Sequence, residues 1–177
     1  MKTIISGIGI ALLVFIFGCA SSVSVKHDYD PGYNFTNLKT YDWLPVKSEN
    51  LEISELRIKR FQNAVNQELA AKGKTLSSEN PDFLIALHGM TKTRVNVTDW
   101  GYSYGPYWRA GYRDVDVSSY EEGTIFLDFV DAESKELFWR GVGTGVAEPN
   151  LSAEQQEKKF ASAASKLLEK FPPSAGK

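Results

Sequence analysis

The sequence is poor in the residues on which most metal and disulfide sites depend. Its 177 residues include one cysteine and two histidines, with 20 Lys and Arg against 22 Asp and Glu. A single cysteine cannot form an intrachain disulfide, and the isolated His27 and His88 do not supply the three or four ligands of a zinc site. Binding of nucleic acid needs clustered basic side chains, and no basic stripe occurs. The sequence therefore predicts no metal, no cofactor and no nucleic-acid partner.

Motifs that mark common enzyme classes lack the context that their chemistry needs. The pattern Gly-x-Ser-x-Gly occurs at Gly101–Gly105, but this segment lies between two expected strands and not at the strand-to-helix turn of a nucleophile elbow, and no glycine-rich loop has the spacing of a phosphate-binding site. Paired carboxylates occur at Asp28 with Asp30 and at Asp114 with Asp116, but neither pair lies in a full calcium-binding loop. We interpret these side chains as solvated charges and turn caps, and we assign no catalytic residue.

A hydrophobic run long enough to cross a membrane as a helix is missing as well. The apolar run from Ile4 to Phe17 has about 14 residues, whereas a spanning helix needs about 20. A short apolar run behind Lys2 is typical of a secretory signal peptide.

Cys19 follows this run and indicates which class of signal peptide it belongs to. The order Ile16-Phe17-Gly18-Cys19 resembles a bacterial lipoprotein signal, in which residues 1–18 are removed and the cysteine receives lipid. The alternatives are an ordinary signal peptide with a chance cysteine and an uncleaved anchor, because Phe17 is bulkier than the residue usual at that position. Ala20 and Ser21 follow the cysteine, and by resemblance to Gram-negative sorting rules this indicates the outer membrane, on its periplasmic face. Residues 19–22 would then form a lipid-bearing tether.

Residues 23–173 have the patterns of a single α+β domain, followed by a tail at 174–177. Alternating or continuous apolar residues predict strands at 23–29, 39–44, 83–97, 124–130 and 137–145. One apolar stripe predicts a helix at 55–72 with Ser54 as its cap, and another predicts a helix at 153–171 behind the capping box of Ser152 and Gln155. The expected fold is a two-layer sandwich of a mainly antiparallel sheet, with about five strands, and two helices in the order β-β-α-β-β-β-α.

Two of the expected strands have patterns that predict how they pack. The run Phe83–Leu87 is apolar throughout, which suits a central strand buried on both faces. Gly141, Gly143 and Gly145 alternate along the last strand, and bare alternate positions let a helix approach the sheet closely.

The segment between the third and fourth expected strands is rich in aromatic residues and glycine. Tryptophan and tyrosine rings with a polar tip suit stacking on glycans, extended peptides or lipid head groups. The alternative is a long hairpin loop whose rings fold back on the sheet. Because only three or four residues separate Cys19 from the first strand, the domain would lie close to the bilayer, and we expect this loop at its membrane-proximal end. The candidate ligand-binding or membrane-facing residues are Trp100, Tyr102, Tyr104, Tyr107, Trp108 and Tyr112.

Several segments together resemble a family of bacterial lipoproteins, the domain of unknown function numbered 4136. They cover nearly all of the chain beyond the expected signal peptide. The resemblance implies an envelope lipoprotein with an α+β domain and carries no catalytic residues. The matching segments are Asp28–Asp30, Phe35–Pro45, Asn80–Leu84, Glu122–Thr124, Asp128–Ala132, Phe138–Gly141 and Phe171–Pro173.

The sequence therefore predicts a non-enzymatic envelope lipoprotein. Its expected partners are the membrane, through the N-terminal lipid on Cys19, and an envelope protein or glycan that it binds as an adaptor. One alternative is a hydrolase of envelope polymers that uses carboxylates such as Asp28, Asp42 or Asp128. The other is a purely structural envelope lipoprotein.

Overall fold

A computed structural model describes residues 23–46, 54–99 and 115–173. The elements follow one another as β1, a 3-10 turn, β2, α1, β3, β4, β5, β6 and α2. Their bounds are β1 Ser24–Tyr29, the turn Phe35–Asn37, β2 Thr40–Trp43, α1 Glu55–Ala71, β3 Thr75–Leu76, β4 Phe83–Asp99, β5 Val115–Asp131, β6 Leu137–Val146 and α2 Ala153–Leu168.

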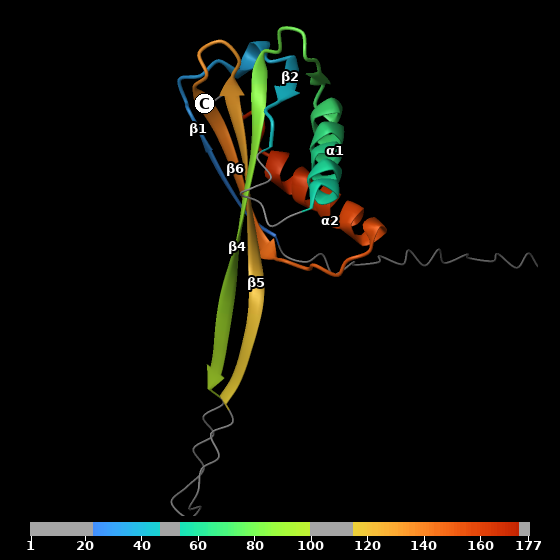
Figure 1. Cartoon of the computed structure of the whole chain (residues 1–177). Helices are drawn as coiled ribbons and strands as arrows, with labels where there is room; N and C mark the ends of the chain where they lie inside the picture. Colours follow the sequence, from blue (N-terminus) through green and yellow to red (C-terminus); the bar gives the residue numbers. More distant parts are fainter. Residues whose placement is uncertain (1–22, 47–53, 100–114, 174–177) are drawn as a thin grey trace, which may run out of the picture.

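The strands form one six-stranded sheet in the order β1-β6-β5-β4-β2-β3. β2 runs parallel to β3 and β4, and the other neighbours are antiparallel. Both helices pack on the same face of the sheet and against each other (Figure 1). The expected two-layer α+β fold is confirmed, with six strands instead of about five. The additional strand is β3, whose two residues are too few to show an alternating pattern.

The helices begin and end largely where the sequence indicates. In α1 the apolar stripe of Ile58, Phe61, Val65 and Leu69 is buried, and Gly73 ends the helix region with a φ of 74°. The prediction that Ser54 caps α1 through its side chain is wrong, because Ser54 occupies the N-cap position without a side-chain hydrogen bond.

The capping box of α2 is confirmed. The Ser152 hydroxyl accepts a hydrogen bond from the Gln155 main-chain N–H, and the Gln155 side chain accepts one from the Ser152 N–H. Two otherwise unpaired N–H groups of the first turn are thereby satisfied.

The core lies between the sheet and the two helices. On β4, Phe83, Ile85 and Leu87 are buried, whereas Leu84 and Ala86 are only half-buried. The prediction that this strand is buried on both faces is therefore wrong, because α1 and α2, the helices of the described residues, both lie on one face of the sheet. Aromatic rings fill the centre of the core: Phe129 contacts Trp139 at a centroid distance of 4.7 Å and Phe171 at 4.5 Å.

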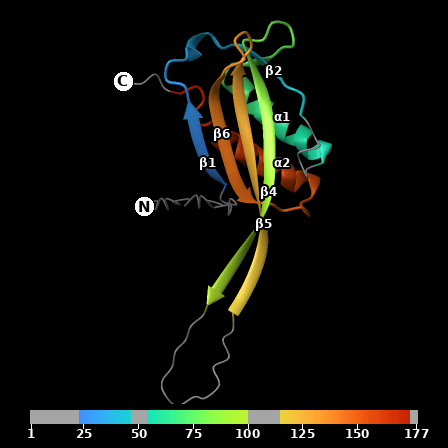
Figure 2. The same ribbon diagram turned by 60° about the vertical axis from the view of Figure 1, so that its left-hand side comes forward.

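β4 and β5 form a hairpin that is much longer than the rest of the sheet. Their pairing runs from Phe83 with Asp131 to Asp99 with Val115. β6 accompanies β5 only as far as the pair Glu122–Val146. Residues 93–99 and 115–121 therefore form a two-stranded arm that projects from the body of the domain (Figure 2). At about 3.4 Å per residue, the arm from Glu122 to Val115 is roughly 24 Å long.

Candidate functional site

The N-terminal end of β1 and the base of the arm lie at the same end of the body (Figure 1). Ser24 of β1 pairs with Thr144 of β6, and the residues of β6 next to Thr144 pair with the residues of β5 at which the arm begins. A Cβ atom on Gly145 would lie 3.5 Å from Cγ2 of Val23. The chain therefore joins the sheet beside the point where the arm leaves it.

A pocket with a volume of about 200 Å³ lies at this end, between the sheet and the helices, and it is open on one side. We call it the arm-base pocket. Its lining is mainly apolar and comes from Val23 just before β1, from the middle of β4 and of β5, from the end of β6, from the β6–α2 loop, from α2 and from the first turn of α1. The apolar residues that line it include Val23, Ile125, Leu151, Phe160, Ala163 and Leu167.

Glycines of two neighbouring strands give the arm-base pocket its depth. A Cβ atom on Gly123 would meet nothing closer than the Ala147 Cβ atom at 3.8 Å, so this position is open. A Cβ atom on Gly143 would touch Leu167 at 3.4 Å. The prediction that bare positions on β6 let a helix approach is confirmed, because Leu167 of α2 packs over Gly141 and Gly143. The contribution of Gly123 on β5 was missed, since only strand register places it beside Gly145.

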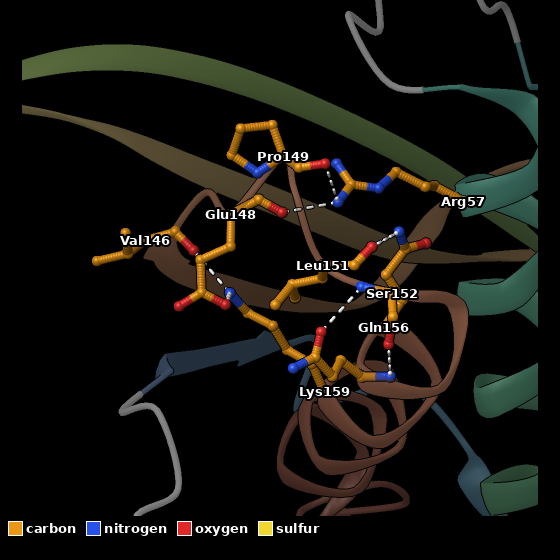
Figure 3. A network of polar contacts seen from close by, with 9 residues as sticks. Arg57, Val146, Glu148, Pro149, Leu151, Ser152, Gln156 and Lys159 are labelled. Carbon is orange, nitrogen blue, oxygen red and sulfur yellow. Dashed lines mark hydrogen bonds and ion pairs between the residues drawn. The ribbon is translucent and has the colours of Figure 1, made fainter.

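Charged side chains from both helices hold the rim of the pocket (Figure 3). Nη2 of Arg57 donates to the main-chain carbonyls of Glu148 at 2.7 Å and Pro149 at 3.4 Å. Nζ of Lys159 donates to the Val146 carbonyl at 2.8 Å and to the Glu148 carboxylate at 2.9 Å. These bonds join α1 and α2 to the loop that links β6 with α2.

Gln156 completes the rim as a buried polar residue. Its Nε2 donates to the Leu151 carbonyl at 2.8 Å, and its Oε1 accepts from Nη1 of Arg60 at 2.9 Å (the Leu151 bond is drawn in Figure 3). A buried amide with both ends bonded fixes its own rotamer and the neighbouring backbone. The rim is thus built before any ligand binds. No simple sequence pattern pointed to the rim, because the hydrogen bonds of Arg57 and Arg60 join residues far apart in the chain.

Cys19 and the aromatic segment lie outside the described residues. The structure places only the points where they join the fold. Val23 is four residues beyond Cys19 and lines the arm-base pocket. Asp99 and Val115 end the two strands of the arm, so the segment between them is the connection of a hairpin, as expected. The aromatic residues concerned are Trp100, Tyr102, Tyr104, Tyr107, Trp108 and Tyr112.

The carboxylates considered for hydrolysis, Asp28, Asp42 and Asp128, do not line the arm-base pocket. Asp128 is buried on the uncovered face of the sheet, where Arg140 binds both of its oxygens at 2.6 Å. Asp28 lies opposite Arg140 on the neighbouring strand. Asp128, by its hydrogen bonds, raises the pKa of the Arg140 guanidinium. Asp42 lies on β2 and accepts from the Trp43 main-chain N–H at 2.8 Å.

The remaining polar candidates have structural partners. Asp30 accepts a hydrogen bond from the Gly32 N–H at 2.8 Å and so closes a turn, as interpreted from the sequence. His27 lies on β1 and its Nε2 is 2.8 Å from the Leu167 carbonyl. His88 lies on β4, 3.6 Å from a carboxylate oxygen of Asp128. Within the described ranges, no three His, Cys, Asp or Glu side chains are grouped as metal ligands would be, and no helix there is long and apolar enough to span a membrane.

Several solved structures are similar to this chain at low sequence identity. A PDZ domain protein from Parabacteroides distasonis matches with a TM-score of 0.54 and 14% identity, over 87% of this chain and 36% of that one. This chain thus spans about a third of that protein, and the likeness shows the fold alone. A PelC dodecamer from Paraburkholderia phytofirmans matches at 0.49 and 13%, over 83% and 95% of the two chains. A minor lipoprotein from Acinetobacter baumannii matches at 0.40 and 11%, over 75% and 91%.

Comparison by sequence gives the family. A search of the curated proteins found no match. The model of a domain of unknown function, DUF4136, matches residues 25–173, which include every described strand and helix but for the first residue of β1. The chain belongs to the DUF4136 family.

Proposed function

We propose that the protein is a non-enzymatic envelope lipoprotein, anchored through Cys19 on the periplasmic face of the outer membrane, which binds an envelope component with its arm-bearing end. The observation that carries this proposal is the shared position of Val23 and the base of the arm. An anchor four residues before Val23 would hold that end of the body, with its pocket and its arm, next to the bilayer.

Chain lengths support this orientation. The four residue steps from Cys19 to Val23 reach at most about 14 Å, whereas the arm extends roughly 24 Å beyond Glu122. An arm that points toward the bilayer would therefore reach it while the body is still held close by the tether. Tryptophan and tyrosine are enriched at membrane–water interfaces, and the segment that joins the two arm strands contains Trp100 and Trp108 among its aromatic residues. We therefore assign the arm the role of contacting lipid head groups or an envelope partner there.

The arrangement of the carboxylates favours binding over hydrolysis. Glycoside hydrolases use two carboxyl groups about 5–9.5 Å apart with room for water or substrate between them. Between Asp28 and Asp128 the structure places Arg140, which binds Asp128 through two hydrogen bonds. Both oxygens of Asp128 are thereby engaged by Arg140 and are not available to a substrate.

Metabolic labelling with palmitate tests the anchor. The wild-type protein should incorporate the label and float with membranes, and the Cys19→Ser variant should do neither. Labelling that survives this substitution would refute the anchor and the orientation argued from it.

In-cell crosslinking tests the arm. Alanine at Trp100, Tyr107 and Trp108 should remove neighbours that the wild-type protein captures, while the folded domain keeps its urea midpoint. An unchanged set of neighbours would contradict a binding role for the arm and favour a structural lipoprotein.

A further inference from the structure

We infer that the arm-base pocket binds one acyl chain of an anionic membrane lipid. The inference rests on the proposed function, because it is the anchor that brings this end of the body to the bilayer. It goes further by naming the ligand and the residues that would hold it.

The size of the pocket restricts the ligand to a small apolar group. Its volume is about 200 Å³. Pockets for whole drug-sized ligands measure about 300–1,000 Å³, whereas an apolar cavity of about 150 Å³ in another protein accepts benzene. The arm-base pocket therefore has room for the end of one aliphatic chain and is too small for an oligosaccharide or a folded peptide.

The lining selects an apolar ligand over a polar one. Ile125, Phe160 and Leu167 supply hydrocarbon surface, and the glycines of β5 and β6 add bare backbone whose polar groups lie in the strand ladder. Among the described residues, Trp139 Nε1 is the buried side-chain nitrogen or oxygen that lacks a hydrogen-bond partner, and Trp139 does not line this pocket. A sugar ring placed against this apolar floor would lose water from its hydroxyls and find few partners for them there, whereas an acyl chain has no hydroxyls to desolvate.

Unused donors at the rim favour an anionic head group. Among the residues that line the pocket, Arg57 and Lys159 are balanced by Glu148 and Glu121. The preference for an anion therefore rests on the free donors of Arg57 and on Arg60, which lies beside the pocket through its bond to Gln156. In the described part of the chain, the Arg57 guanidinium donates only through Nη2. A guanidinium has five N–H donors, so Arg57 retains donors for a phosphate while it holds the loop. A lipid head group would thus meet cations at the mouth as its chain enters the apolar floor.

The position of Val23 indicates that an acyl chain in the pocket would come from the bilayer. Val23 lines the pocket and lies four residues from Cys19, so the tether would keep the mouth within about 14 Å of the membrane surface. The acyl chains of Cys19 itself are a second source of the same chemistry. We commit to a lipid of the surrounding bilayer, and the experiment separates the two.

Photo-crosslinking of the full lipidated protein tests the inference. The protein is reconstituted into vesicles of phosphatidylethanolamine and phosphatidylglycerol that contain a trace of phosphatidylglycerol with a diazirine at the end of one acyl chain. Crosslinked peptides should include residues 143–151 or 160–167. Replacing phosphatidylglycerol and its probe with phosphatidylcholine equivalents should lower that yield at least threefold, and an equal yield would refute the role of the cations.

Matched variants separate the pocket from general membrane contact. Gly123→Leu fills the pocket from its floor and should reduce the crosslinks at these peptides at least fivefold. Gly123→Ala, whose added atom meets nothing closer than 3.8 Å, should fold normally and give an intermediate reduction. Val142→Leu adds bulk to the opposite face of β6 and should change nothing. Crosslinks confined to residues 19–23 or to the arm, or an unchanged yield in both Gly123 variants, would overturn the inference.

Two further outcomes are distinguishable in the same samples. If Cys19→Ser in these vesicles crosslinks at the pocket and the lipidated protein does not, the protein's own acyl chain occupies the site and the bilayer source is refuted. Flotation is measured alongside crosslinking. Protein that floats without pocket crosslinks overturns the acyl-chain site alone, whereas lipidated protein that stays in solution overturns the proposed function.

Discussion

Arg57 and Glu148 are 91 residues apart in the sequence, yet Nη2 of Arg57 lies 2.7 Å from the main-chain carbonyl of Glu148. This bond ties the first turn of α1 to the loop between β6 and α2, and Lys159 of α2 holds the same loop from the other side. The mouth of the arm-base pocket is therefore held by side chains of both helices and is part of the tertiary fold.

Replacing Arg57 should loosen this loop. Hydrogen bonds that involve a charged group contribute about 1.5–3 kcal/mol, so we expect Arg57→Gln to lower the free energy of unfolding by about 1.5 kcal/mol and to speed amide hydrogen exchange at residues 147–152. Urea denaturation and exchange followed by mass spectrometry measure both effects. The control is Lys158→Gln, which breaks an exposed ion pair with Glu154 and should cost less than about 0.5 kcal/mol. Equal exchange in the two variants would contradict the role of Arg57.

Two glycines of the sheet should respond oppositely to alanine. A Cβ atom on Gly141 would lie 2.7 Å from Cη2 of the buried Trp139 and 3.2 Å from Leu167. Overpacking of this kind costs about 1–3 kcal/mol. Gly123→Ala meets open space instead, and alanine restricts the unfolded chain, so its free energy of unfolding should stay equal or rise by up to about 1 kcal/mol. Urea midpoints decide this, and equal losses in the two variants would show that the pocket floor is closed.

Asp131 should make stability depend on pH in the acid range. Hydrogen bonds from the Ser134 N–H and the Tyr33 hydroxyl lower the pKa of Asp131. Because the folded-state pKa lies below the unfolded value of about 3.9, this contribution is complete above pH 4 and is lost as the pH falls through the folded-state pKa. Asp131→Asn should therefore be less stable than wild type at pH 7, with the difference shrinking toward pH 2. A difference independent of pH would contradict the assignment.

Asp128 and Arg140 should prove structural. Removing Arg140 leaves a buried carboxylate without its two hydrogen bonds. Arg140→Met should cost about 1–2 kcal/mol, less than a fully buried pair because the guanidinium is partly exposed. The double variant Asp128→Leu with Arg140→Met removes the stranded charge and should recover much of the loss. If the double variant loses as much free energy of unfolding as the two single variants together, the pair does not act as a unit.

Local patterns in the sequence were enough for most elements of the fold. The apolar stripe of α1, the capping box of Ser152 and Gln155, and the alternating glycines of β6 each depend on neighbours in the chain, and all three appear in the structure. The parallel pairing of β2 with β4 was missed although a signal existed, because a strand, a helix and a strand in succession favour a parallel crossover.

The candidate site was harder to predict, since its parts meet only through register and packing. Gly123 becomes pocket floor because β5 pairs with β6 at Gly145, and no periodicity within either strand contains that information. The rim depends in the same way on contacts such as Arg57 with the Glu148 carbonyl. The strand expected at 124–130 begins at Val115 instead, because the polar residues of β5 before Thr124 hide the strand pattern.

Nuclear magnetic resonance can show directly whether an acyl chain from the bilayer enters the arm-base pocket. The lipidated protein is placed in phosphatidylglycerol nanodiscs that carry a lipid spin-labelled near the end of one acyl chain. We expect the spin label to broaden the amide signals of Gly123, Gly143 and Gly145 strongly and that of Gly32 not at all, and we expect the broadening to be lost in Gly123→Leu. Broadening confined to Val23 and the arm, with sharp signals from the three glycines, would contradict this expectation.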